Sequence, residues 1–289
     1  MASDSFRDSG FARGDGPTRT AVSDGSAEGP AAQVGAAPWR RISLWRSFAY
    51  LLIPVAVLSL ISGSLALATQ WAPPEHVETA RFWFYFFDVG REINVPTWFS
   101  AGLWITAGLL AGYFARRASR HRRSWALFAV VCIVFSIDET LELHERLDVI
   151  GNELARYLPV QLGFTWVLPG VLIAGLIVLS LLRMVLALPA APRAALLTAG
   201  VVFVGGGVGV ETLSGLFIEG EALPWQYFLL TLIEESLEMA GTALAVAALA
   251  HLVAYRHLAD RSTSFLVADG ALPDALPDAG PGSEPGSGR

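Results

Sequence analysis

Carboxylates inside long apolar stretches are the residues of this sequence best able to do chemistry. They fall in three segments, 136–146, 205–214 and 231–241. An ionised carboxylate at the centre of a bilayer costs ~2.5–3.5 kcal/mol, so each must hold a proton, pair with a basic side chain or bind a cation. The candidate metal ligands are Asp138, Glu139, Glu142, His144, Glu145, Glu211, Glu235 and Glu238.

The spacing of the acids in the first segment predicts which of them can meet. At ~100° per residue in a helix, Asp138, Glu142 and Glu145 lie within about 60° of one another, and Glu139 lies at the margin of that face. His144 points ~100° away from the face. It therefore fits this site only if the helix distorts near its end.

The other two segments each offer a polar face. Glu211 shares a helix face with Gly207 and Ser214, and the acids between 231 and 241 form a stripe of helical period. Glycines at 205–207 and 209 would let a neighbouring helix approach closely. We expect the three segments to deliver their carboxylates to one depth, in the outer half of the membrane.

This set of side chains favours a metal cation over other ligands. A site rich in oxygen with at most one histidine suits Mn, Mg, Ca or carboxylate-bridged Fe better than Cu, and Zn is a further candidate. The Glu-x-x-His motif of ferritin-like di-iron proteins is absent from the sequence. The sequence thus predicts a cation site open to the external face, which could serve a membrane metalloenzyme.

Two other functions use the same residues. Intramembrane acids also form proton relays and cation pathways, so a proton- or cation-coupled transporter is an alternative. If the third span ends a turn earlier, Asp138 to Glu145 would instead be a solvated helix end that pairs with Arg146. The protein would then be a structural membrane protein.

The elements that must position these acids are membrane helices. The chain is 53% hydrophobic and only 16% charged, whereas soluble domains carry roughly 25% charged residues. Its apolar runs approach the ~20 residues that a helix needs to cross the hydrocarbon core. The sequence predicts an all-α bundle with about six transmembrane helices, near 44–68, 98–116, 124–147, 165–188, 194–218 and 227–255.

Arginine predicts the orientation of this bundle. Twelve arginines lie near the span ends on one side and four, at 81, 91, 146 and 156, on the other. The positive-inside rule places the richer side, with both termini, in the cytoplasm. The arginines are too dispersed for a nucleic-acid surface. The predicted partners are the lipid bilayer and a cation or small molecule from the external side.

The ends of the chain and one loop differ from the bundle in composition. Residues 1–39 and 259–289 are rich in Gly, Ala, Ser, Pro and Asp, and we expect disordered cytoplasmic tails on either side of a membrane domain at 40–258. Residues 79–90 include six consecutive aromatic side chains. They predict a short helix in or on the outer leaflet, or an early start of the second span.

Three strings of the sequence resemble a group of uncharacterised bacterial multi-pass membrane proteins. They are Val95–Ser100, Ser136–Arg146 and Glu234–Gly241. The resemblance covers the membrane region and neither tail. It implies a bacterial plasma membrane location and brings no activity or site residue with it.

Overall fold

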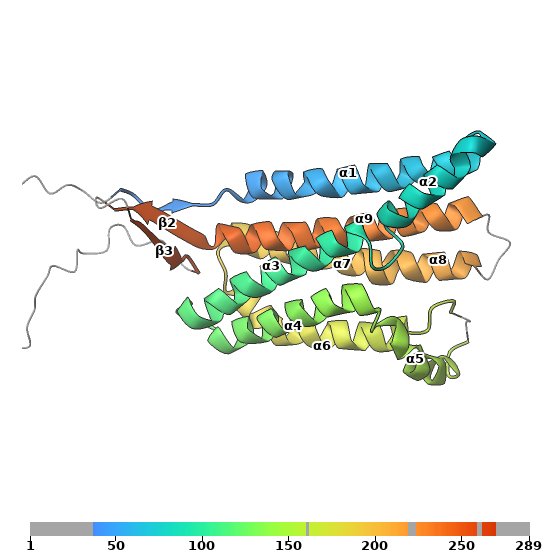
Figure 1. The fold of residues 1–289 in the computed structure, drawn as a ribbon. Helices are drawn as coiled ribbons and strands as arrows, with labels where there is room; N and C mark the ends of the chain where they lie inside the picture. Colours follow the sequence, from blue (N-terminus) through green and yellow to red (C-terminus); the bar gives the residue numbers. More distant parts are fainter. Residues whose placement is uncertain (1–36, 160–161, 219–223, 259–261, 270–289) are drawn as a thin grey trace, which may run out of the picture. The chain divides into compact units, whose positions relative to one another are not determined.

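The computed structural model describes residues 37–159, 162–218, 224–258 and 262–269. Most of these residues are helical (Figure 1). The predicted tail at 1–39 lies outside the described residues up to residue 36, as do 259–261 and 270–289 of the other predicted tail.

Long helices make up the bundle, and shorter elements connect them. In chain order they are α1 (Leu44–Trp71), α2 (Pro74–Phe87), α3 (Val95–Arg117), α4 (Arg122–Leu141), the 3-10 turn η1 (Glu145–Leu147), α5 (Asp148–Ala155), α6 (Val167–Leu186), α7 (Ala190–Val204), the π-helix η2 (Gly205–Val210), α8 (Glu211–Ile218) and α9 (Pro224–His251).

Five helical segments are long and apolar enough to cross a membrane. Within the described residues they are α1, α3, α4, α6 and the continuous stretch Ala190–Gly215. The prediction of helices long and apolar enough to cross a membrane is confirmed for these five. The sixth predicted span corresponds to α9, which has 28 residues but carries Glu234, Glu235 and Glu238 in its first half or at its middle.

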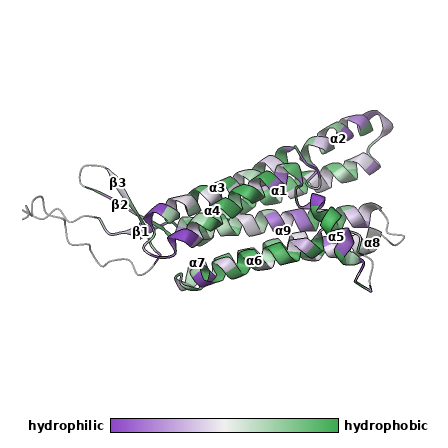
Figure 2. Cartoon of the chain, turned by 90° about the horizontal axis from the view of Figure 1, so that it is seen from below, coloured by the Kyte–Doolittle hydropathy of each residue, from purple (hydrophilic) through white to green (hydrophobic). Residues whose placement is uncertain are grey.

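α9 tolerates its glutamates because other helices surround it. It packs against α1, α3, α7, η2 and α8, and in Figure 1 it runs through the middle of the bundle. Every residue from Gly241 to Leu249 is buried. Along the other long helices, hydrophobic residues dominate and hydrophilic residues gather at the ends (Figure 2). Leu172, Leu176 and Leu179 of α6 are 62%, 66% and 70% exposed, as expected for side chains that face lipid.

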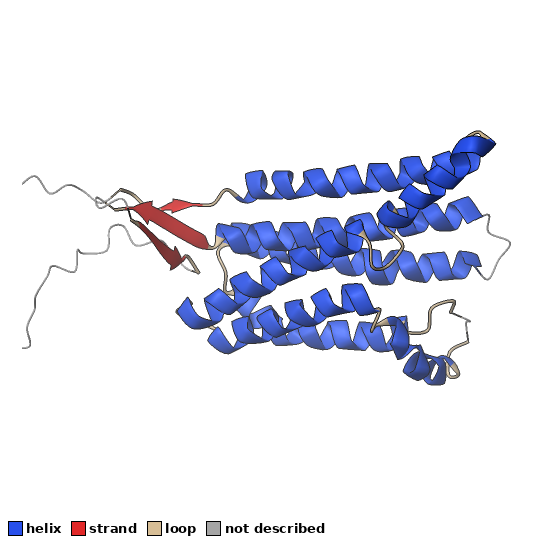
Figure 3. Cartoon of the chain, viewed as in Figure 1, coloured by secondary structure: helices blue, strands red, loops and turns tan. Residues whose placement is uncertain are grey.

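A small sheet lies at one end of the bundle and corrects the all-α prediction (Figure 3). Its antiparallel strands are β1 (Arg40–Arg41), β2 (Val253–His257) and β3 (Thr263–Val267), in the order β1-β2-β3. The predicted span 227–255 is therefore too long, because the chain is already extended at Val253. The predicted disorder of 259–289 is wrong for 263–267, where Thr, Phe and Val favour a strand.

The aromatic segment forms a helix of its own. α2 has 14 residues, and the loop at 88–94 separates it from α3. An early start of the second span is therefore wrong, and the short-helix alternative is confirmed, although the helix begins at Pro74 rather than near residue 79. At ~1.5 Å per residue α2 is too short to cross a bilayer.

Candidate functional site

The predicted site residues gather at the end of the bundle away from the sheet. α4 and α7–α8 run away from the sheet and α9 returns towards it (Figure 1). Asp138 and Glu139 lie in the last turn of α4, Glu211 begins α8, and Glu238 is near the middle of α9. Glu238 is thus the deepest of these carboxylates, ~21 Å along α9 from its first residue at 1.5 Å per residue.

The end of α4 brings His144 into the site. The helix stops at Leu141 because Glu142 adopts a left-handed conformation, with φ of 48°. The chain then turns back, so that both the backbone N–H and the ring Nδ1 of His144 lie 2.8 Å from the carboxylate of Asp138. The helix is thus distorted near its end, which is the condition under which the sequence allowed His144 to reach the site.

The same reversal removes Glu142 and Glu145 from the predicted helix face. Glu142 follows the last residue of α4, and Glu145 is exposed in η1. The third span is therefore shorter than the predicted 124–147, and the phase argument holds only for residues up to Leu141. These two acids lie at the rim of the site.

Two tryptophan indoles hold the carboxylates of α4 and α8. Trp104 Nε1 donates to Glu139 Oε1 at 3.1 Å, and the hydroxyl of Ser100 also bonds Glu139. Trp166 Nε1 donates to the buried Glu211 at 2.7 Å. Hydrogen bonds of this kind satisfy buried acceptors that would otherwise be costly.

The glutamates of α9 lie against the glycines of η2. A Cβ at Gly207 would collide with the carboxylate of Glu238, and one at Gly206 would lie 3.0 Å from the carbonyl oxygen of Glu234. Gly206 and Gly207 therefore make room for α9, as predicted, whereas a Cβ at Gly205 or Gly209 would meet nothing within 4 Å. π-Helical turns of this kind are frequent at functional sites.

These carboxylates act on one another. We call Glu139, Glu211, Glu234, Glu235 and Glu238 the acidic cluster. Coulombic repulsion connects Glu238 to the other four and Glu235 to Glu139, Glu234 and Glu211. His144 is the basic side chain whose charge acts on Glu139, Glu211 and Glu234. Thus four of the eight predicted site residues belong to the cluster, and His144 with Asp138 borders it.

His144 is poised to carry that positive charge. Burial alone would lower the pKa of its imidazole, but the hydrogen bond and charge of Asp138, with the charges of Glu211 and Glu145, raise it above the ordinary value. The ring also packs edge-on against Trp166, with 4.5 Å between ring centroids. Trp166 therefore contacts both His144 and Glu211.

Glu92, in the loop before α3, also faces the cluster. Burial, followed by the charges of Glu142 and Glu139, raises its pKa to about 8. Its Oε2 atom is buried and has no hydrogen-bond partner among the described residues. Glu92 was not among the predicted site residues.

Sequence reasoning also missed Trp104 and Trp166, and it left Glu234 out of the proposed ligands. A tryptophan near a span end is typical of an interfacial anchor, so no pattern marked either indole as a carboxylate donor. Glu234 is buried, with 9% exposure. It could have been predicted as a site residue, because it belongs to the polar stripe of its helix.

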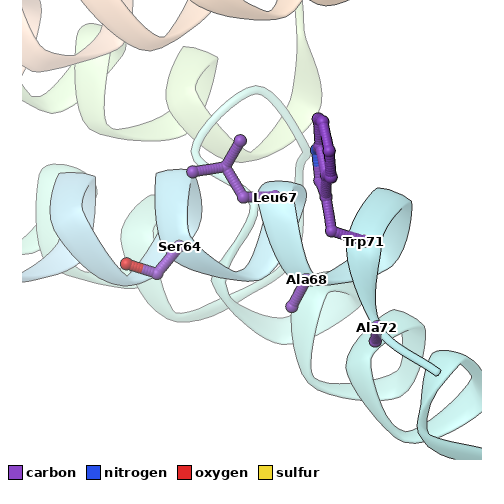
Figure 4. Close-up of a pocket in the computed structure, with 5 residues that line it drawn as sticks. All are labelled: Ser64, Leu67, Ala68, Trp71 and Ala72. Atoms are coloured by element: carbon purple, nitrogen blue, oxygen red, sulfur yellow. The ribbon is translucent and has the colours of Figure 1, made fainter.

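The cluster is not a preassembled metal centre. Within the described ranges, no group of three or more His, Cys, Asp or Glu side chains is arranged so that it could hold a metal ion. A groove elsewhere, lined by Ser64, Leu67, Ala68, Trp71 and Ala72 (Figure 4), lies along the end of α1 and contains no acidic residue. It is separate from the candidate site.

Comparison with known proteins identifies a family for the membrane part of the chain. Residues 49–252 match the model of the domain of unknown function DUF8692. The chain belongs to this family. No curated protein and no solved structure matches it.

The DUF8692 match lies within the helical bundle and does not include the sheet. The matched residues 49–252 contain every predicted site residue, together with Glu92, Trp104 and Trp166. They stop one residue before β2 begins at Val253. The acidic cluster is thus part of the DUF8692 domain, and the three strands lie outside the match.

Proposed function

We propose that this protein binds a cation in the acidic cluster, from the end of the bundle away from the sheet. One observation carries the proposal. Three helical segments bring five carboxylates into mutual repulsion, and His144 is the basic side chain that acts on them. Glu211 and Glu234 are buried and the other three acids are half-buried, so these carboxyl groups need protons or a cation to remain inside the bundle.

The donor atoms suggest the class of cation. The cluster offers carboxylate oxygens only, which suit hard cations such as Ca, Mg and Mn, or carboxylate-bridged Fe. Asp138 and His144 border the cluster, so a Zn or Fe ion at that border would gain the nitrogen donor Nε2, because Nδ1 is engaged with Asp138. Redox or hydrolytic chemistry at such a metal would make the protein a membrane metalloenzyme.

Binding would require the side chains to move together. Glu139 and Glu211 are each held by an indole N–H, and a cation would recruit their second oxygens. Glu238 lies against Gly207 and has a flexible side chain. The exposed Glu145 at the rim fits a role in attracting cations better than a role as a ligand.

A proton relay is the second candidate, and one line of neighbours favours it. Glu92 interacts with Glu139, Glu139 with Glu235, and Glu235 with Glu238. This line leads from the loop before α3 to the middle of α9. Beyond it lies Thr242, and residues 243–250 of α9 are Ala, Leu and Val only. The line thus supports proton storage or exchange with a cation more than passage across the bilayer.

We further propose that the protein is a six-span protein of the bacterial plasma membrane with both termini in the cytoplasm. The five membrane-length helices support this topology, and so does the burial of α9 among them. The excess of arginine at the sheet end supports the orientation.

Metal content tests the proposed function. We would purify the protein in detergent without chelators and measure Fe, Mn, Zn, Ca and Mg by mass spectrometry. The variants Glu211→Gln and Glu238→Gln would be compared with Glu153→Gln, a matched control because Glu153 is exposed in α5 and pairs with Arg156 at 2.9 Å.

We expect near-stoichiometric metal in the wild type and in Glu153→Gln, and its loss from both cluster variants. A wild type without bound metal, even after incubation with each ion, would reject the cation proposal. Proton uptake by the protein in liposomes, abolished by Glu238→Gln, would then support the relay.

A further inference from the structure

At the sheet end of the bundle, one turn presents an exposed face of arginines. The turn between α3 and α4 carries Arg116, Arg117, Arg120, Arg122 and Arg123 within eight residues. All five are exposed. His121 adopts a left-handed conformation in this turn, with φ of 55°, and Arg122 donates to the carbonyl oxygens of Ala115 and Arg116. Arg122 therefore fixes the turn, and the other four project from it.

The sheet is tied directly to this turn. Both the backbone N–H and the hydroxyl of Ser119 donate to Asp269, just after β3, at 3.0 and 2.9 Å. β1 pairs with β2, so that Arg40 lies opposite Tyr255. Arg256 of β2 packs over the Trp39 ring at 4.8 Å. Because side chains alternate along a strand, Arg40, which pairs with Tyr255, and Arg256 lie on opposite faces of the sheet.

Acidic residues do not neutralise this face in the described part of the chain. Among the described residues, Asp269 is the one acid at this end, and its carboxylate accepts both hydrogen bonds from Ser119. The ion pairs of the described residues, Arg81–Glu78, His144–Asp138 and Arg156–Glu153, are all at the other end. The buried Nε of Arg256 also has no partner among the described residues.

The level of this face along the bundle suggests its partner. Arg116 and Arg117 are the last residues of a helix long enough to cross the membrane, and Arg122 and Arg123 are the first residues of the next. Trp45, near the start of α1, is 70% exposed, and exposed tryptophans favour the lipid headgroup level. The guanidinium group of arginine forms bidentate hydrogen bonds with phosphate groups.

We propose that this arginine face, formed by Arg116, Arg117, Arg120 and Arg123, binds the headgroups of anionic phospholipids. Clusters of four to eight basic residues next to membrane helices are typical of such recognition. The sheet joins the segment before α1 to the segment after α9, and Asp269 links it to this turn through Ser119.

Lipid selectivity of the full chain tests the proposal. The protein in a neutral detergent would be titrated with phosphatidylglycerol or with phosphatidylcholine of the same acyl chains, and bound lipid counted by native mass spectrometry. The test variant is R116Q/R117Q/R120Q/R123Q. The matched control, R81Q/R91Q/R146Q/R156Q, removes the same charge from the other end.

We expect the wild type and the control to prefer phosphatidylglycerol. The test variant should bind this lipid with an affinity at least about tenfold lower, since several charges contribute. Circular dichroism would verify that both variants keep the helical content of the wild type. A second measurement needs no variant, because raising NaCl from about 0.1 to 1 M should abolish the wild-type preference.

Three results would overturn the proposal. One is a wild type that binds both lipids equally. Another is an equal loss in the test and control variants. The third is a preference for phosphatidylglycerol that persists in about 1 M salt.

Discussion

The carboxylate of Asp138 binds His144 through two contacts. The backbone nitrogen of His144 lies 2.8 Å from one carboxylate oxygen, and the ring Nδ1 lies 2.8 Å from the other. The left-handed Glu142 makes this contact possible by ending α4 at Leu141, three residues after Asp138. The pair is partly buried, with side-chain exposures of 36% for His144 and 17% for Asp138. It sets His144, whose charge acts on Glu139, Glu211 and Glu234, beside its own counter-ion.

The first prediction concerns the charge of His144. Asp138→Asn removes the carboxylate that raises the pKa of His144, and burial, which lowers it, should then dominate. We expect the imidazole of the variant to lose its proton at a lower pH than that of the wild type. NMR titration of histidine-labelled protein measures this. An unchanged titration of His144 would contradict the pairing.

The same shift has a consequence for stability. Because the folded state raises the pKa of His144, the pair stabilises the protein fully below pH ~6.5, the ordinary value for histidine. This contribution is lost as the pH rises through the folded-state pKa. The melting temperature of the wild type should therefore fall over this range more than that of His144→Gln.

The second prediction concerns Glu92, whose pKa is raised to about 8. A carboxyl group that is harder to ionise in the folded protein makes stability fall as the pH rises from its ordinary value, ~4.3, through 8. Glu92→Gln should melt at the same temperature as the wild type near pH 5 and at a higher temperature near pH 9. Thermal unfolding at a series of pH values measures the difference.

Glu153→Gln is the control for this comparison, since Glu153 is exposed and paired with Arg156. Its melting temperature should follow the wild type at every pH. If Glu92→Gln behaves in the same way as this control, Glu92 ionises normally and does not share the field of the cluster.

Particular residues show how far the sequence alone could lead. The spans and the three acid-bearing segments follow from hydropathy and helical period, because the length of a membrane helix is fixed by the bilayer. The approach of η2 to α9 followed from the glycines at 205–207. Composition also identified the arginine-rich end. These inferences depend on local sequence or on membrane dimensions.

The position of His144 and the indole donors could not be predicted in the same way. Whether α4 continues past Leu141 depends on a single left-handed residue, Glu142, which is not a glycine and carries no strong local signal. Trp104 and Trp166 reach Glu139 and Glu211 across 35 and 45 residues of sequence. Such contacts are set by tertiary packing. The strand β3 was likewise missed because five residues beside a Pro- and Gly-rich tail gave too short a pattern.

The third prediction tests the packing of α7 on α9. A Cβ at Gly241 would lie 2.8 Å from the backbone nitrogen of Phe203 and 2.9 Å from the carbonyl oxygen of Ala199. These backbone atoms cannot move without separating the helices, so Gly241→Ala should destabilise the protein by about 1–3 kcal/mol, as overpacking typically does. Gly200→Ala is the control, because a Cβ there meets nothing within 4 Å. Melting temperatures in detergent that are equal for the two variants would argue against this close approach.

The last prediction separates the acidic cluster from the stability of the bundle. A Cβ at Gly207 would collide with the Glu238 carboxylate, which sits at the end of a flexible side chain and can move aside. Gly207→Ala should therefore displace that carboxylate and abolish cation binding while the protein stays folded. Gly205→Ala and Gly209→Ala, in the same π-helix, place a Cβ where nothing lies within 4 Å. They should keep the cation and gain up to about 1 kcal/mol of stability, the usual effect of replacing glycine in a helix.

Metal analysis and melting temperature, measured on all three variants, test whether Glu238 is a ligand. Equal metal content in the three would mean that Glu238 is not a ligand, whereas loss of metal from Gly207→Ala alone would place the cation beside η2.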